Sequence, residues 1–172
     1  MKNSLIILAL LFSGCARHAP PATAPPAQSI AKKSYVIPFE RTESGLMTVS
    51  VIININTDHP DFRPLPKRLV VDTGCARTCF FVSNKAVSDL SKILPHAKLD
   101  ERRMANGSGM RVCTFDPARV TVGDVSVDIP VDASGYDIRL DMPFDGCLGI
   151  DFLSRFNVQF DFHAKTMALT ER

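Results

Sequence analysis

An apolar stretch that ends in an acidic residue constrains this chain more than any other feature. Residues 69–71 are Leu-Val-Val, and Asp72, Thr73 and Gly74 follow directly. The apolar residues predict a buried strand, and a carboxylate at its end is costly unless the charge is paired or used. Thr73 and Gly74 are small, which suits a crowded turn with close backbone approach. Taken alone, the three residues also fit an ordinary turn capped by Asp72.

A second motif lies near the C-terminus, and a third lies between the two. Residues 147–153 read Cys-Leu-Gly-Ile-Asp-Phe-Leu, and Asp151 stands where the N-cap of a short helix through Phe156 belongs. Residues 104–110 contain Asn106-Gly107, a strong hairpin-turn signal because both residues tolerate positive φ. The order is therefore an acidic loop, a hairpin and a late apolar segment with glycine.

This order of motifs resembles the retropepsin-like (clan AA) aspartic proteases, in particular the bacterial single-domain lipoprotein type. The resemblance covers roughly Tyr35 to the C-terminus. It implies a mainly β fold, a small closed acid-protease barrel with one or two short helices. It also implies that Asp72 is catalytic and that Thr73 and Gly74 complete the active-site loop. The implied flap and substrate-binding residues are Asn106, Gly107, Ser108 and Gly109, and those beside the loop are Leu148 and Gly149.

The implied activity is that of an aspartic endopeptidase, which needs two carboxylates sharing one proton. The chain has one Asp-Thr-Gly, and the other candidates fit structural roles better: Asp151 as a helix cap, Asp161 as a surface or edge residue, and Asp132 in a turn. A homodimer would supply the second Asp72, because an isologous interface places the same residue on both sides of its axis. The expected partners are a peptide or protein substrate and a second copy of the chain.

Two other functions stay open, and several are disfavoured. The barrel could serve a non-catalytic lipoprotein as a peptide-binding or assembly module, and the cysteines alone suggest thiol-redox chemistry. Four scattered histidines show no zinc spacing, and Gly107-Ser108-Gly109 lacks the rest of a dinucleotide fingerprint, so neither a metal nor an organic cofactor is expected. A net charge of +2 without a basic block disfavours nucleic acid.

The N-terminal segment predicts export. Residues 1–14 combine Lys2 with a short apolar run and end in Ser-Gly before Cys15, which resembles a lipoprotein signal peptide with Cys15 as lipid anchor. Ordinary secretion with cleavage near Ala16 or Ala19 is the alternative. Residues 15–33 form a tether rich in Pro and Ala, and residues 34–172 form the protease-like domain. We expect the cell envelope, lipid-anchored on the periplasmic side with the outer membrane favoured, or the cell surface.

Four cysteines remain if Cys15 carries lipid. An even number in an oxidising compartment suggests disulfides, and four cysteines allow three pairings, among which the sequence does not choose. Some could instead be small buried apolar residues. The resemblance places Cys147 near Cys75 or Cys79, while it says nothing of Cys113.

Alternation and turn residues predict many short strands and one clear helix. Ser83 can cap a helix over residues 83–94, whose apolar residues repeat at helical spacing. A loop is expected over residues 57–67, which hold three prolines. The expected strands are residues 35–39, 47–55, 69–71, 78–82, 119–122, 125–131, 158–162 and 166–169.

Overall fold

A computed structural model describes residues 32–55, 63–94, 97–103, 107–136 and 142–172. The predicted signal peptide, Cys15, nearly all of the tether, and Asn106 lie outside the described residues. In the part of the chain that the structure describes, no helix is long and apolar enough to cross a membrane.

The described residues form mainly strands, in agreement with the predicted fold class. In chain order the elements are β1 (Ser34–Pro38), β2 (Glu40–Arg41), β3 (Met47–Ile55), β4 (Leu65–Val71), β5 (Cys79–Val82), α1 (Asn84–Ile93), β6 (Lys98–Arg103), β7 (Gly109–Val122), β8 (Val125–Gly135), β9 (Gly146–Leu148), α2 (Ile150–Leu153), β10 (Phe156–Asp161) and β11 (Thr166–Glu171).

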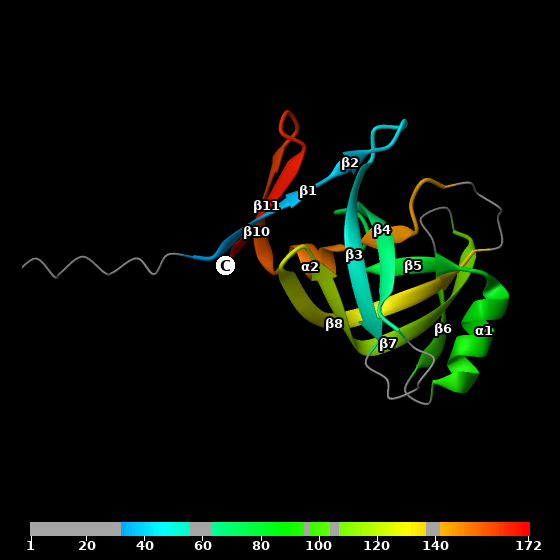
Figure 1. Cartoon of the computed structure of the whole chain (residues 1–172). Coiled ribbons are helices and arrows are strands. Elements are labelled where there is room, and N and C mark those ends of the chain that lie inside the picture. The colour runs from blue at the N-terminus through cyan, green and yellow to red at the C-terminus, as the bar shows by residue number, and fades with distance from the viewer. Residues whose placement is uncertain (1–31, 56–62, 95–96, 104–106, 137–141) are drawn as a thin grey trace, which may run out of the picture. The chain divides into compact units, whose positions relative to one another are not determined.

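The larger sheet closes on itself as a barrel (Figure 1). Its strand order is β2-β3-β4-β9-β5-β8-β7-β6, and β3 also pairs with β7, which joins the two sides of the sheet. Strand β7 pairs with β8 on one edge, while on its other edge the first half pairs with β6 and the second half with β3. A bulge between Phe115 and Ala118 separates the two halves, as expected where a strand bends. The predicted closed barrel is therefore confirmed.

A smaller antiparallel sheet joins the two ends of the domain. Its strand order is β1-β11-β10, so the first described strand lies beside the last. Ser34 is in register with Thr170, and Pro38 with Thr166. The C-terminal strand β11 is central in this sheet and is hydrogen-bonded on both edges. Figure 1 shows this sheet at the end of the barrel away from α1.

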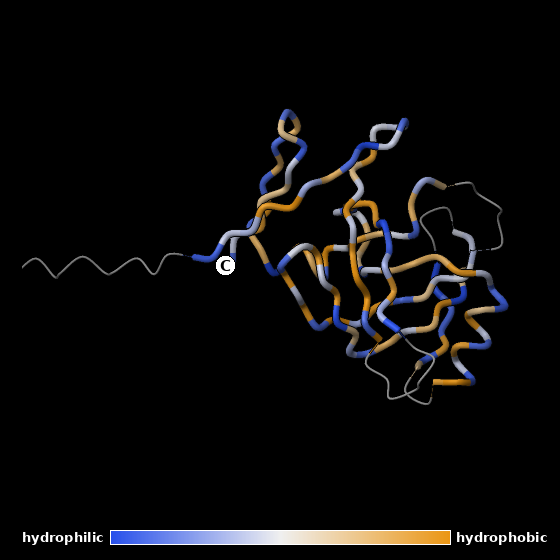
Figure 2. The backbone as a smooth tube through the Cα atoms, in the orientation of Figure 1, coloured by the Kyte–Doolittle hydropathy of each residue, from blue (hydrophilic) through white to orange (hydrophobic). Residues whose placement is uncertain are grey.

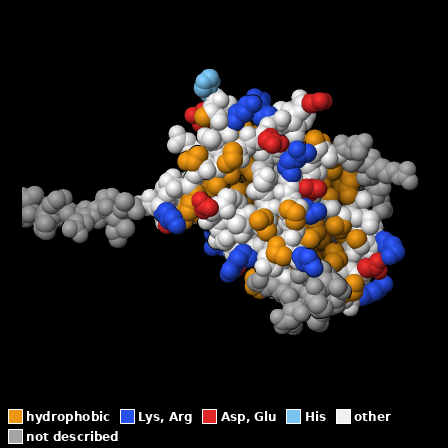
Figure 3. All heavy atoms as spheres, in the orientation of Figure 1, with side chains coloured by type: hydrophobic (Ala, Val, Ile, Leu, Met, Phe, Trp, Pro, Cys, Tyr) orange, Lys and Arg blue, Asp and Glu red, His pale blue; other side chains and the backbone are white. Residues whose placement is uncertain are grey.

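The core fills the barrel with aliphatic and aromatic side chains. Strand β3 alternates as predicted, with Val49, Val51 and Ile53 buried and Ser50 and Ile52 exposed. Figure 2 shows apolar segments along the barrel strands and polar residues at many of the turns. On the face shown in Figure 3, Lys and Arg side chains are interspersed with Asp, Glu and apolar groups.

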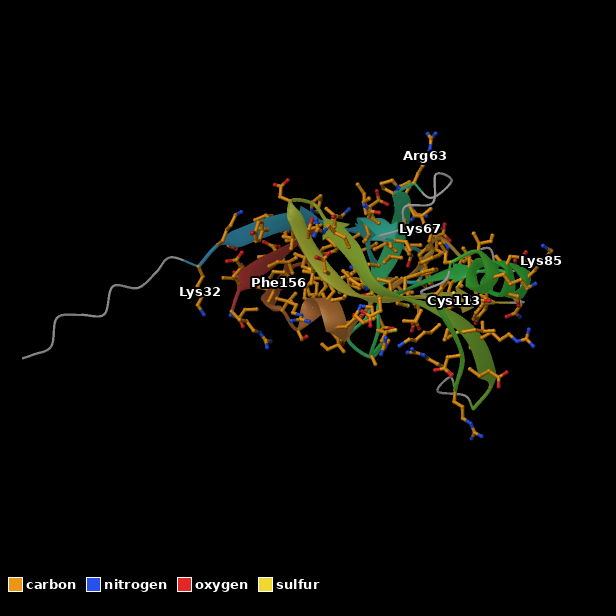
Figure 4. The ribbon with its side chains drawn as sticks, turned by 90° about the horizontal axis from the view of Figure 1, so that it is seen from below. Lys32, Arg63, Lys67, Lys85, Cys113 and Phe156 are labelled. Carbon is orange, nitrogen blue, oxygen red and sulfur yellow. The ribbon has the colours of Figure 1, made fainter. Side chains whose placement is uncertain are left out.

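The predicted helix is confirmed as α1. The hydroxyl of Ser83 accepts a hydrogen bond from the Ala86 N–H at 3.2 Å, which is the expected N-cap interaction. Val87 is buried, and Lys85 points away from the barrel in Figure 4. The helix packs on β6, β7 and β8 and so covers one end of the barrel.

Several predicted boundaries are wrong. The short helix predicted to run through Phe156 ends at Leu153, and the strand predicted over residues 119–122 begins at Gly109. The strand before Asp72 begins at Leu65 rather than Leu69, because Pro66 lies opposite Ile52 and the pairing with β3 continues through it. Asp132 lies in β8 and is buried, not in a turn. Strand β8 continues because it pairs with both β7 and β5, and these partners are distant in sequence.

Candidate active site

The loop that follows β4 is held by a strand from the far end of the chain. Strand β9 lies between β4 and β5, which are the strands on either side of residues 72–78, and it is parallel to β4 and antiparallel to β5. Val71 is in register with Leu148, and the Asp72 N–H donates to the Leu148 carbonyl at 3.1 Å. The structure thus brings Leu148 and Gly149 beside the Asp72 loop.

The Asp72 carboxylate is half-buried at the start of this loop. Its Oδ1 accepts a hydrogen bond from the Gly74 N–H at 2.8 Å, and the Cys75 N–H donates to the Asp72 carbonyl at 3.2 Å. Thr73 and Gly74 are exposed. The loop therefore fixes the carboxylate through short backbone bonds and leaves the turn itself open to another molecule.

Gly149 allows β9 to approach the loop closely. A Cβ atom at Gly149 would lie 2.5 Å from the carbonyl carbon of Arg77 and 2.8 Å from the Thr78 nitrogen. These are backbone atoms, which cannot move aside as a flexible side chain can. The next residue, Ile150, donates its N–H to the Cys75 carbonyl at 2.8 Å. Glycine at position 149 is thus required by packing against the loop.

Asp151 holds the far end of the loop and is not the N-cap that the sequence predicted. The N-cap of α2 is Gly149, and Asp151 lies in the first turn. Its Oδ1 accepts from the Thr78 N–H at 2.9 Å and from the Thr78 hydroxyl at 2.8 Å. The Phe152 N–H also donates to Asp151 Oδ1, at 2.9 Å. The Asp151 carboxylate thus accepts hydrogen bonds from Thr78, a residue that the sequence did not mark as part of the site.

The predicted flap is a hairpin of β6 and β7. Arg103 is in register with Gly109 at its described end. Gly107 has a φ of 82°, a conformation that favours glycine. Gly107, Ser108 and Gly109 are exposed.

An ion pair between the buried Asp132 and the partly exposed Arg102 links this hairpin to the barrel. The Arg102 guanidinium lies 2.9 Å from Asp132 Oδ2, and the Thr114 hydroxyl donates to Asp132 Oδ1 at 2.6 Å. Burial raises the pKa of Asp132, while Thr114 and then Arg102 act in the opposite direction. Asp132 is in register with Cys79, so the pair lies next to the strand that follows the Asp72 loop. No local signal marks Arg102, because its partner is on a different strand.

Three thiols lie beside the loop. Cys75, Cys79 and Cys147 have sulfur atoms that are all within 4.8 Å of one another. The four described cysteines are free thiols, so the structure does not contain the disulfides that the sequence suggested. The implied proximity of Cys147 to Cys75 and Cys79 is confirmed. Cys113 is fully buried in β7, inside the body of the barrel in Figure 4, and fits the small apolar role.

Hydrogen bonds among the three thiols shift their pKa values in different directions. The Cys147 thiol, and then the Cys79 thiol, lower the pKa of Cys75. The pKa of Cys147 is raised, first by its bond with Cys75, and that of Cys79 is raised by both neighbours and by burial. When protonated, Cys75 donates to the Arg77 carbonyl at 3.0 Å. Within the group, the thiolate form is therefore favoured more at Cys75 than at Cys79 or Cys147.

Two hollows on the surface are lined by described residues. One of about 790 Å³ is lined by Glu40, Arg41, Thr42, Glu43, Ser44, Thr48, Arg68 and Pro143. Another of about 440 Å³ is lined by Ser50, Val51, Ile52, Pro66, Lys67, Arg68, Thr121, Gly123 and Asp145. Neither includes a residue of the Asp72 loop.

Comparison with known proteins finds likeness among solved structures. No family model matches the chain, and no curated protein matches it. Among solved structures, the chain is similar to a retropepsin-like aspartic protease from Rickettsia conorii, with 17% sequence identity and a TM-score of 0.47, over 82% of this chain and 94% of that chain. A likeness of this size assigns no activity to the chain.

Proposed function

We propose that this protein is an aspartic endopeptidase in which Asp72 is the catalytic carboxylate. The observation that carries the proposal is the position of Asp72, half-buried directly after the buried residues 69–71 of β4 and fixed by the Gly74 N–H at 2.8 Å. The bond from the Asp72 N–H to the Leu148 carbonyl anchors the same residue to β9. An exposed turn with a rigidly held carboxylate is suited to general acid–base chemistry.

The second carboxylate is proposed to come from another copy of the chain. Three acidic residues near the loop in space or sequence are engaged elsewhere: Asp151 with Thr78, Asp132 with Arg102 and Thr114, and Asp145 with the Arg68 N–H at 2.8 Å. A two-fold axis beside Thr73 and Gly74 would bring two Asp72 residues together. Ile150, which is 41% exposed beside the loop, would add apolar contact.

In such a pair one carboxyl group is ionised and the other is protonated, because two adjacent carboxylates repel each other when both are ionised. The ionised Asp72 takes a proton from water, and the oxygen attacks the peptide carbonyl. The protonated Asp72 supplies a proton as the C–N bond breaks. The products are a carboxylic acid and an amine, and the pair again holds one proton, which now lies on the other Asp72.

The substrate is proposed to be an extended peptide held under the hairpin of β6 and β7. Gly107 and Gly109 have no atom within 4 Å of an added Cβ, so the hairpin end has room for close approach. Leu99 on β6 is 54% exposed and offers apolar contact. An extended peptide is bound by backbone bonds, with alternate side chains giving specificity.

Cleavage of a peptide library tests this function. The purified protein should cleave it, and Asp72→Asn should lower the rate by roughly 10²–10⁴-fold. Asp124→Asn is the matched control, because Asp124 is exposed in the turn between β7 and β8. Wild-type cleavage by Asp72→Asn would refute the proposal, and binding of peptides without cleavage by the parent protein would point to the peptide-binding module.

The lipid anchor is proposed from the sequence alone. Mass spectrometry of membrane fractions should find diacylglyceryl on Cys15, and Cys15→Ser should release the protein from the membrane. A mature N-terminus elsewhere, with an unmodified Cys15 thiol, would contradict this localisation.

A further inference from the structure

The three thiols beside the Asp72 loop come from three separate segments that the backbone holds in place. Cys79 on β5 is in register with Cys147 on β9. Both backbone polar groups of Cys75 are hydrogen-bonded. Its N–H donates to the Asp72 carbonyl at 3.2 Å, and its carbonyl accepts from the Ile150 N–H at 2.8 Å. The convergence of the three sulfurs therefore follows from the main fold and not from one flexible side chain.

The sulfur positions are close to those of a metal site. Zinc–sulfur bonds of about 2.3 Å in a tetrahedral site place two sulfurs about 3.8 Å apart. The three sulfur atoms here are within 4.8 Å of one another, so shifts of about 1 Å are enough to bring them to a common ion. Cys75 and Cys147 are half-buried while Cys79 is buried, which leaves an approach from solvent.

We propose that Cys75, Cys79 and Cys147 bind a thiophilic metal ion of the Zn²⁺ or Cu⁺ type. Thiolates select these soft or borderline ions. As the ion binds, three sulfur–metal bonds form and each thiol still protonated releases its proton to solvent. Three sulfurs satisfy Cu⁺, and water would complete four-coordinate Zn²⁺. The bound ion cross-links the Asp72 loop to β5 and β9, and this role is independent of the proposed peptidase activity.

A disulfide explains the cluster less well. It would join two of the sulfurs and leave the third beside them without a role, whereas all three converge. Cys113 provides an internal comparison, because it is equally a free thiol but lies outside the cluster.

Metal titration of the reduced full-length chain under nitrogen tests the proposal. The chain carries Cys15→Ser so that the remaining cysteine outside the domain does not interfere. Zn²⁺ and Cu⁺ are titrated separately in competition with a chromophoric chelator, and Co²⁺ reports thiolate ligation by its absorption. We expect one ion per chain and affinity at least about tenfold weaker in Cys75→Ser, Cys79→Ser and Cys147→Ser. Cys113→Ala should bind as the parent does.

Alkylation of the unmutated cluster supplies a readout that does not depend on the folding of variants. Bound metal should protect Cys75, Cys79 and Cys147 together, as measured by peptide mass spectrometry. The proposal would be overturned if the reduced protein bound neither ion. It would also be overturned if the three serine variants bound metal as tightly as the parent protein. A disulfide within the cluster, with no metal binding after its reduction, would overturn it too.

Discussion

Thr78 and Asp151 are 73 residues apart, yet the Asp151 carboxylate accepts hydrogen bonds from both the N–H and the hydroxyl of Thr78, at 2.9 and 2.8 Å. The same hydroxyl accepts from the Gly149 N–H at 3.1 Å. Thr78 is fully buried, so these partners replace water for its polar groups. The pair ties the end of the Asp72 loop to the junction of β9 and α2.

Thr78→Val should lower the free energy of unfolding by about 1–3 kcal/mol. Valine keeps the shape of threonine but lacks the hydroxyl. The Asp151 carboxylate would lose one hydrogen-bond donor, and the Gly149 N–H would stay buried without the Thr78 hydroxyl as its acceptor. Denaturant unfolding measures the change. Thr121→Val is the control, because its bond to Ser126 is exposed, and it should change stability by less than about 0.5 kcal/mol. Equal stabilities of the two variants would contradict this role of Thr78.

Gly149→Ala should destabilise the protein by about 1–3 kcal/mol, as overpacking does, because its Cβ would meet the backbone of Arg77 and Thr78. Gly109→Ala offers the same chemical change with nothing within 4 Å. Thermal unfolding compares the two, and the melting temperature of Gly109→Ala should stay near that of the parent. A tolerated Gly149→Ala would mean that β9 lies further from the loop than described here.

The proposed dyad predicts a rate that depends on both concentration and pH. Activity per molecule should fall on dilution, because the site exists only in the dimer. The rate should follow a bell in pH, since protonating both Asp72 residues removes the base and ionising both removes the acid. Specific activity measured against both variables checks this. A constant rate from a proven monomer would exclude the shared dyad.

Asp132 should make the protein less stable as pH rises. Its folded pKa lies above the ordinary value of 3.8, so between the two values the folded chain holds more protons than the unfolded chain. The free energy of unfolding should fall across this window and then level off, and Asp132→Asn should remove that component. Unfolding measured from pH 3 upward, on both proteins, gives the comparison.

Asp128→Asn is a control of opposite sign. Arg119 lowers the pKa of Asp128, so this residue contributes stability above the unfolded pKa that is lost as pH falls. The pair is exposed, and the change should therefore be small.

If Asp132→Asn leaves the pH dependence unaltered, the effect of burial on Asp132 is refuted.

Local sequence determined those features whose causes lie within a few residues. Ser83 caps α1 through a bond to Ala86, three residues away, and β3 alternates because one of its faces is buried. Asp72 ends an apolar strand, and Gly123 takes a positive φ in the turn after β7. The mainly β barrel could be predicted because many short alternating segments need neighbours to bury one face.

Tertiary structure alone decided which distant segments meet, because pairing energy comes from partners that no local pattern contains. It placed Asp151 on Thr78 instead of at a helix cap, and it kept Asp132 inside β8 beside Arg102. It also brought Cys75, Cys79 and Cys147 within 4.8 Å, where the sequence had suggested disulfides without choosing a pairing. For Asp151 and the three thiols the physical reason is the same, because β9 inserts between β4 and β5 and so builds the surroundings of the Asp72 loop. Asp132 is instead held inside β8 by the pairing of that strand with β7 and β5.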